Sequence, residues 1–450
     1  MEAIQKPNRN TEKGSVLLTV AINLFVGIAL VLVILDQANN HSRIATRQVN
    51  MDQAMYVAEG GLERGSQYIL SNMVALVTAT STNTTGTGTI GTGSYAYTIT
   101  RINNNLFSIV STGTVNSVTR TGSTGSISRV VSILRIYQPT YAEFAFWSHD
   151  NNAIYFALGD NFYGHVHVDS APYFDATGGG PNFYDLMTSM AGTYVIKNGL
   201  LSSIEFDKGY NWSSFQGSMA NIDFNSAAAT SLKSIATSSG LVLSGNSTLT
   251  FGGSTVQITN PTRGWTNYVY TPPTLGIIYI ANNGSVTGSK AGTAILNGGT
   301  ISGQLTVVAE NDMTIQGNIT YSNDPRIHPT STSALGLISQ DDISVGTSAP
   351  NNLEVDAAIM TTGTSGDGSA GSWGVINYDS GSTRGNLTIY GGIVQNSRGA
   401  VGTLSGGVLA TGYSKNYSYD PRFINNPPPY YPVVAGVVTF ANWQEGPRAP

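Results

Sequence analysis

An uncharged apolar run from Val16 to Leu35 constrains this chain more than any other sequence feature. Twenty helical residues at about 1.5 Å each span about 30 Å, which matches the hydrocarbon core of a bilayer. Only Thr19 and Asn23 interrupt the apolarity. The run therefore predicts a membrane-spanning helix.

The charges on either side of this run predict its orientation. Lys6, Arg9 and Lys13 precede the run, and Asp36 is the first charged residue after it. Basic residues are enriched on the cytoplasmic side of membrane helices. We therefore expect the N-terminus in the cytoplasm and nearly all of the remaining chain on the other side of the membrane.

Proteolytic processing has two alternative forms here. A secretory signal peptide has a shorter apolar core, followed by a cleavage site of small residues. In this chain the core is long, and residues 36–41 lack a convincing site of that kind. Cleavage after Gly14 is the other alternative, and it would leave the apolar helix on the mature protein.

A second apolar pattern continues the helix beyond the membrane. Apolar side chains recur at steps of three, four or seven residues, which is typical of one face of an amphipathic helix. The Gly60-Gly61 pair lowers helix propensity by about 1 kcal/mol per glycine, so we expect a kink there. The predicted helix covers residues 15–75, and its apolar stripe comprises Ile44, Met51, Met55, Ala58, Leu62 and Ile69.

Two segments at this end of the chain resemble type IV pilins and, more closely, the PilX-type N-terminal family of minor pilins and pilus-assembly proteins. They are Lys13-Gly14-Ser15-Val16-Leu17-Leu18 and Tyr56-Val57-Ala58-Glu59-Gly60-Gly61-Leu62-Glu63. The resemblance implies a cytoplasmic leader over residues 1–14. It also implies that a prepilin peptidase cuts between Gly14 and Ser15.

The same resemblance implies a location and partners. Such a protein crosses the bacterial inner membrane once and holds its head in the periplasm, or outside the cell on a pilus. Its partners are other pilin or pseudopilin subunits, the assembly platform and the prepilin peptidase. Most pilins have Phe or Met where this chain has Ser15.

Thr19 is a second departure from the pilin pattern, because major pilins have a glutamate at this position. That glutamate is thought to pair with the terminal amine of a neighbouring subunit, and a charge inside a bilayer needs such a partner. Thr19 cannot form that ion pair, which implies a minor subunit of the tip or assembly type. The alternative is a tolerated hydroxyl that bonds to its own helix backbone.

The composition of the rest of the chain predicts a mainly β fold. The sequence has 52 glycines, 10% charged residues and no cysteine, and 40% hydrophobic residues is too apolar for a disordered chain. A formal charge of −5 argues against nucleic acid as a partner.

We expect a linker and a small β-meander over residues 76–138. Within it, residues 78–93 read as a loop, followed by antiparallel strands over 94–102, 106–115 and 129–137.

Residues 139–426 predict a β-solenoid head resembling a parallel β-helix. Asp312-Met-Thr-Ile-Gln-Gly317 and Asp342-Ile-Ser-Val-Gly346 repeat after 30 residues, a spacing typical of solenoid coils. A β-sandwich would give similar local signals. Residues 427–450 read as a Pro-rich tail and a capping strand.

The head also resembles an exported domain that follows PilX-type helices in uncharacterised bacterial proteins. The resemblance lies at Gly159-Asp160, Gly164-His-Val-His167, Gly317-Asn-Ile-Thr-Tyr321, Leu387-Thr-Ile-Tyr-Gly-Gly-Ile393 and residues 413–422.

His165 and His167 are the candidate metal ligands in this head. Two positions apart on a strand, they face the same side, and His149, Asp160 or Asp169 could complete a site. The alternative is a polar pair bonded to backbone on a solvated face. We expect no cofactor.

Carboxylates for polysaccharide cleavage are a further alternative, but aspartates at strand ends are normally turn residues. We therefore expect no enzyme and no catalytic residue. The side chains considered for this chemistry are Asp312, Asp341, Asp342, Asp356 and Arg384.

Two functional classes follow from these observations. The first is a minor component of a type IV pilus or a type II secretion-like pseudopilus. The alternative is a membrane-anchored surface protein that binds or cleaves carbohydrate. Five tyrosines near the C-terminus stack on surface glycans, pack against a partner subunit or, as the simplest alternative, cover a solenoid end. They are Tyr413, Tyr417, Tyr419, Tyr430 and Tyr431.

Overall fold

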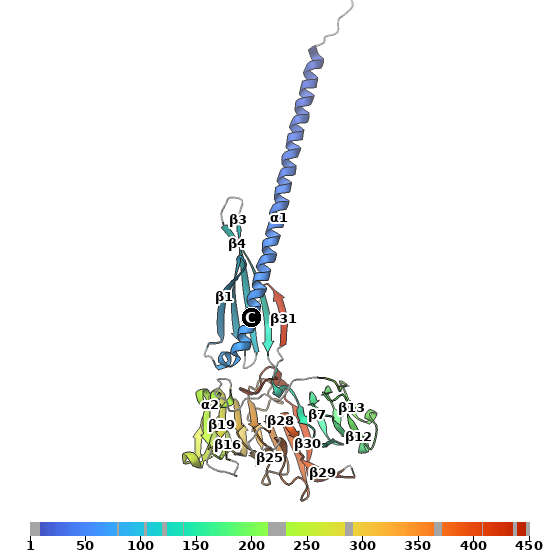
Figure 1. The fold of residues 1–450 in the computed structure, drawn as a ribbon, viewed down its shortest axis with the longest axis vertical. Helices are drawn as coiled ribbons and strands as arrows, with labels where there is room; N and C mark the ends of the chain where they lie inside the picture. The colour runs from blue at the N-terminus through green and yellow to red at the C-terminus, as the bar shows by residue number, and fades with distance from the viewer. Residues whose placement is uncertain are drawn as a thin grey trace, which may run out of the picture.

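The fold consists of a long N-terminal helix, a small antiparallel sheet and a β-solenoid head (Figure 1), which confirms the predicted mainly β class. The computed structural model describes residues 10–78, 81–102, 106–118, 124–137, 139–214, 231–283, 291–363, 371–406, 408–434 and 439–446. Residues 1–9 of the predicted leader lie outside the described residues.

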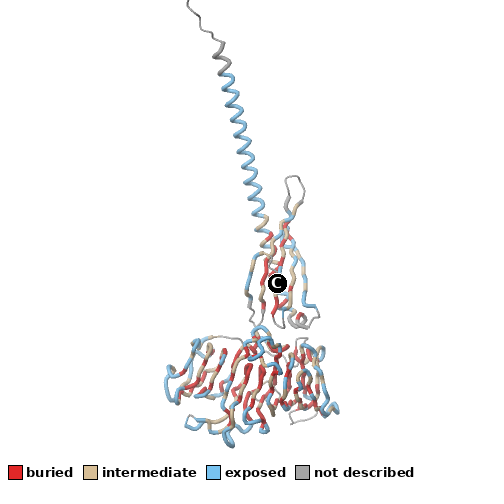
Figure 2. The backbone as a smooth tube through the Cα atoms, turned by 180° about the vertical axis from the view of Figure 1, so that it is seen from behind, coloured by how far each residue is buried: buried red, intermediate tan, exposed pale blue. Residues whose placement is uncertain are grey.

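Helix α1 (Asn10–Thr78) has 69 residues and is therefore about 100 Å long. Every residue from Val16 to Val49 is exposed, whereas one face of the helix is buried from Ala54 onward (Figure 2). The predicted kink at the glycine pair is wrong. Within the described part of α1, non-helical backbone angles occur at Asn72 (φ −132°, ψ 22°) and not at the glycine pair.

The glycines of the helix serve close packing instead of bending. A Cβ atom at Gly61 would lie 2.4 Å from the Ser111 hydroxyl oxygen. From the other side, a Cβ atom at Gly113 would lie 2.2 Å from the Ala54 carbonyl oxygen and 2.3 Å from the Ala58 nitrogen. Helix and sheet therefore approach within backbone contact, which only small residues on both surfaces permit.

The small sheet has the strand order β1-β2-β3-β4-β31, and the pairs between successive strands are antiparallel. Its apolar face packs on α1 around Ile69, Ile99, Phe107 and Ile109. The strands are β1 (Asn83–Ile90), β2 (Gly93–Arg101), β3 (Leu106–Val118), β4 (Thr124–Tyr137) and β31 (Thr439–Glu445).

The first strand corrects the prediction of a loop over residues 78–93. Its alternating threonines and glycines pair with β2 along the whole strand. A Cβ atom at Gly86 would lie 2.2 Å from the ring of Tyr97, and one at Gly88 would lie 2.3 Å from the Tyr95 hydroxyl. The two tyrosine rings therefore cover the glycines, and that cross-strand packing offsets the low strand propensity of glycine.

The head is inserted between the last two strands of the small sheet. The chain enters and leaves the head side by side, because Tyr141 N–H donates to the Pro432 carbonyl (3.0 Å) and Val434 N–H donates to the Pro139 carbonyl (2.8 Å). The strand predicted to cap the head, β31, instead completes the sheet beside β4. An insertion with adjacent ends is the arrangement in which a separate domain is tolerated best.

Most strand pairs in the solenoid are parallel, with antiparallel hairpins at β16–β17–β18 and β29–β30. The 30-residue repeat is a coil repeat, since Met313 pairs with Ile343.

The strands before helix α2 (Leu232–Ser239) are β5 (Phe146–Asp150), β6 (Tyr155–Phe156), β7 (Asn161–Tyr163), β8 (Val166–Val168), β9 (Tyr173–Asp175), β10 (Asn182–Phe183), β11 (Met187–Ser189), β12 (Val195–Lys197), β13 (Glu205–Phe206) and β14 (Tyr210–Asn211).

The strands after α2 form the longer part of the head. They are β15 (Leu241–Ser244), β16 (Ser247–Gly253), β17 (Val256–Asn260), β18 (Trp265–Tyr270), β19 (Leu275–Ala281), β20 (Ala294–Ile301), β21 (Gln304–Ala309), β22 (Met313–Ile315), β23 (Ile319–Tyr321), β24 (Ala334–Ser339), β25 (Ile343–Val345), β26 (Leu353–Thr361), β27 (Ser372–Val375), β28 (Thr383–Arg398), β29 (Gly402–Ser405) and β30 (Val408–Tyr419).

The coils do not stack in sequence order. Strand β5 pairs with β28 through Phe146 and Ile393, and β7 pairs with β30 through Phe162 and Tyr417. The chain therefore enters the stack of coils in its middle, at β5, and winds to one end of the stack by β14. It starts again at the other end with β15 and winds back to the middle, where β28 and β30 pair with β5 and β7. We call the junction of β28 and β30 with β5 and β7 the seam.

The C-terminal tyrosines are packing residues. Tyr413 and Tyr417 point into the solenoid core, and Tyr431 is buried against Gly336 on the outside of the β21–β24 sheet. Tyr419 and Tyr430 are half-buried against the same outer apolar layer. The packing of these five tyrosines is therefore with the apolar layers of the protein itself.

Candidate functional site

The apolar segment of α1 is the first candidate site. Among the described residues, one helix is long and apolar enough to cross a membrane, and none of its most apolar window is buried inside the protein. Gly14 and Ser15 lie in its first turns, and Thr19 is exposed within the apolar segment. This helix is a candidate membrane anchor.

The predicted metal ligands form a hydrogen-bonded chain on β8 and its neighbours. His165 Nε2 and His167 Nδ1 both bond to the Thr188 hydroxyl, at 2.9 and 2.7 Å. The Asp169 carboxylate holds His167 Nε2 at 2.8 Å and His149 Nδ1 at 2.7 Å. Burial lowers the pKa of His165 to about 4, so this imidazole is neutral near pH 7.

This geometry does not fit a metal site. The Thr188 hydroxyl occupies the point on which the two imidazoles converge, at distances typical of hydrogen bonds. Asp160, offered as a third ligand, is instead paired with Lys415. The arrangement of His165, His167 and Asp169 is that of a satisfied polar network between adjacent coils.

The candidate catalytic carboxylates fall into two separate groups. Oxygen atoms of Asp312, Asp341 and Asp342 lie within 4.8 Å of one another, because the coil register places Asp312 beside Asp342. The Asp342 carboxylate also accepts bonds from the Ser372 N–H and hydroxyl, at 2.8 and 2.9 Å. Arg384 lies elsewhere, bonded to the Ala349 carbonyl and over the Tyr413 ring.

Asp356 belongs to the second group, on the outside of β26. Its side chain is fully buried and accepts the Tyr321 N–H at 3.0 Å, while the Arg326 guanidinium lies 3.7 Å away and is itself paired with Glu354 at 2.6 Å. Burial raises the pKa of Asp356 to about 7, although the Tyr321 N–H and Arg326 oppose this.

The raised pKa of Asp356 makes the free energy of unfolding depend on pH. Its pKa is higher in the folded than in the unfolded chain, so the folded state binds more protons between about pH 4 and pH 7 and loses stability as pH rises through this window. Asp356→Asn should flatten that part of the curve. Urea unfolding at several pH values measures this, and equal slopes in both proteins would contradict it.

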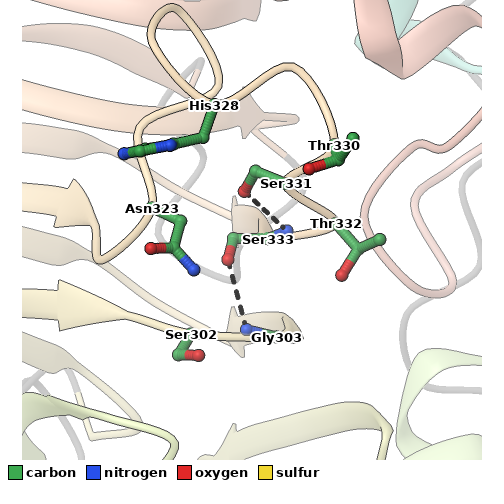
Figure 3. A pocket seen from close by; sticks show the side chains of 8 residues that line it. All are labelled: Ser302, Gly303, Asn323, His328, Thr330, Ser331, Thr332 and Ser333. Atoms are coloured by element: carbon green, nitrogen blue, oxygen red, sulfur yellow. Dashed lines mark hydrogen bonds between the residues drawn. The ribbon is translucent and has the colours of Figure 1, made fainter.

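A polar hollow lies on the loop between β23 and β24 (Figure 3). It has a volume of about 260 Å³, and its wall is braced by Gly303 N–H donating to the Ser333 hydroxyl at 3.3 Å. A second hollow of about 310 Å³ crosses the seam beside Arg398. The first is lined by Ser302, Gly303, Asn323, His328, Thr330, Ser331, Thr332 and Ser333.

The seam contains buried charges that the sequence did not indicate as a group. Lys415 Nζ lies 2.8 Å from both oxygens of Asp160. Arg398 Nη2 is 4.0 Å from the same carboxylate, and Arg398 Nη1 donates to the Asn151 side chain (2.9 Å) and to the Ile154 carbonyl (2.8 Å). These residues are about 250 positions apart in sequence, so only the fold brings them together.

The fold and these sites define a class of protein: a candidate membrane-anchored chain whose single long helix packs on a small sheet and carries a β-solenoid. No family model matches the chain, and no curated protein matches it. Among solved structures, that of the competence-associated pilin ComZ from Thermus thermophilus is 14% identical, with 88% of this chain and 97% of that chain covered and a TM-score of 0.32. A likeness of this degree carries no argument about function.

Proposed function

We propose that this chain is a minor subunit, of the tip or assembly type, of a type IV pilus or a type II secretion-like pseudopilus. In this proposal a prepilin peptidase cuts between Gly14 and Ser15, the N-terminus starts in the cytoplasm, and the head lies beyond the inner membrane. The residues that resemble PilX-type proteins support it.

One structural observation carries the proposal. Helix α1 is exposed on all sides from Val16 to Val49, about 50 Å, and from Ala54 onward one of its faces is buried against the small sheet. A bilayer covers only about 30 Å of that length. The remaining helix, with Ile44 66% and Val49 54% exposed, would be covered by the helices of neighbouring subunits in a filament.

We propose a structural role and no catalysis. The carboxylates of the Asp312 group and of Asp356 lie in separate places, and Arg326 covers Asp356. Arg384, the cation expected to assist them, bonds to backbone elsewhere. The size of the head also supports an end position, because a solenoid this large at the end of the helix would hinder regular stacking along a shaft (Figure 1).

Thr19 provides the test of the minor-subunit role. A hydroxyl cannot recruit a neighbour's amine by charge, so the wild-type protein should label sheared filaments sparsely or at their ends by immunogold microscopy. Thr19→Glu should increase labelling along the shaft several-fold, with Thr19→Gln as the uncharged control of similar size. Dense, regular labelling of the wild-type shaft would contradict the minor-subunit role.

A further inference from the structure

One outer face of the solenoid carries a regular column of tyrosines and amides across the seam. In register, Tyr390 of β28 lies beside Ser418 of β30, which lies beside Tyr163 of β7. The next coil adds Tyr184, whose ring stacks on that of Tyr163 with centroids 4.3 Å apart and planes 1° apart. The tyrosine column is thus interrupted at one position, Ser418.

A parallel column of polar side chains lies two residues earlier on the same strands. Asn182 donates to the Asn161 side-chain oxygen at 2.9 Å, and on the other side of the seam Asn416 contacts the Thr388 hydroxyl at 3.4 Å. These residues face outward, because the positions between the two columns, such as Phe162, are buried in the core. Neighbouring coils are about 4.8 Å apart.

At Ser418 a short side chain stands in register between two tyrosines, and we call this position of the column the notch. On one side, Tyr163 is 46% exposed and has Tyr184 on only one face of its ring. On the other side, Tyr390 is buried, with the Arg326 guanidinium 4.8 Å from its ring centroid. Ser418 has a short side chain between these two tyrosines, and Asn416 lies two residues earlier on the same strand.

The charges around this face indicate an uncharged ligand. The four coils that present Thr388, Asn416, Asn161 and Asn182 carry no charged side chain in either column. Carboxylates flank them on both sides, at Glu354 and Asp356 and at Glu205 and Asp207. Two cations lie near Tyr390, and both are paired: Arg326 with Asp324 and Glu354, and Arg422 with Asp420, whose carboxylate also bonds to Tyr390.

We propose that the notch binds one sugar of a neutral linear glycan, with the sugar ring stacked on Tyr163 over Ser418. The amides of Asn161 and Asn416 can both donate and accept, which suits sugar hydroxyls. An aromatic face suits the apolar C–H side of the sugar ring. Further sugars would follow the amide column, since the coil spacing is close to the length of one sugar unit. This binding is separate from the proposed role in filament assembly.

The test measures binding of the full chain in a polyoxyethylene detergent, which avoids sugar-based detergents that would compete. The probes are neutral xylan, mannan, β-glucan and chitin oligosaccharides, with polygalacturonate as the anionic comparison. Wild type should bind at least one neutral probe and bind polygalacturonate more weakly. Tyr163→Ala should weaken binding about tenfold or more, equivalent to about 1.4 kcal/mol.

Three variants separate stacking from folding. Tyr163→Phe keeps the ring and should bind within about threefold of wild type, whereas Ser418→Tyr fills the notch and should abolish binding while leaving thermal stability unchanged. Tyr268→Ala removes a tyrosine of similar exposure, 45%, on the β17–β18 hairpin and should bind like wild type. Failure to bind any neutral probe, preference for polygalacturonate, or normal binding by Tyr163→Ala would overturn the proposal.

Discussion

Replacing Asp160 with alanine is expected to destabilise the head by about 3–5 kcal/mol, because the change leaves the buried Arg398 and the partly buried Lys415 without their anion. Asp160 is 6% exposed, and both of its oxygens lie 2.8 Å from Lys415 Nζ. Burial lowers the pKa of Lys415, and it lowers the pKa of Arg398 to about 10, so each cation already bears a desolvation cost that Asp160 offsets.

The measurement is thermal and urea unfolding of the full chain, followed by the β-sheet circular dichroism signal. Asp185→Ala is the matched control, because it removes an aspartate of the same half-solenoid whose partner, Lys208, is 64% exposed. Surface pairs of that kind contribute about 1 kcal/mol or less. Equal losses of unfolding free energy in Asp160→Ala and Asp185→Ala would show that Asp160 does not stabilise the seam.

The second large effect is expected from Gly113→Leu, which should separate helix α1 from the small sheet at a cost of about 3 kcal/mol. The added Cβ would meet backbone atoms of Ala54 and Ala58, which cannot rotate away as a side chain can. Hydrogen exchange of the helix over residues 54–69 should become faster by at least tenfold.

Thr112→Leu is the control for that experiment, because Thr112 precedes Gly113 on the same strand and its side chain points to the opposite face. It should leave exchange of the helix unchanged. Protection of residues 54–69 that persists in Gly113→Leu would contradict the close packing of helix and sheet.

The helix and the solenoid could be predicted because their signals are local. An uncharged apolar run from Val16 to Leu35 and a 30-residue repeat are each typical of one kind of structure, a membrane-spanning helix and a solenoid. Strand β1 was missed because its glycines and threonines read as a loop, and only the tyrosines of β2 make it a strand. The prediction of a kink at the glycine pair was wrong for the same reason. Helix propensity is a local quantity, and it takes no account of the sheet that packs on these glycines.

The sites were harder to predict because they depend on coil order. The seam joins residues near Asp160 to residues near Lys415, and no local pattern indicates that a solenoid begins in the middle of its own stack. His165 and His167 do face one side, as their spacing predicts, but Thr188 of the next coil lies between them. Spacing within one strand says nothing about the neighbouring coil.

The central claim is that the apolar helix stays on the mature protein after a cut at Gly14. Intact mass and N-terminal sequence of the protein, purified from membranes of cells with an active prepilin peptidase, test it directly. We predict a mature chain that begins at Ser15, and a chain that retains Met1 when Gly14→Leu is introduced or the peptidase is absent. A wild-type chain that still begins at Met1, or one that begins beyond Leu35, would contradict the account.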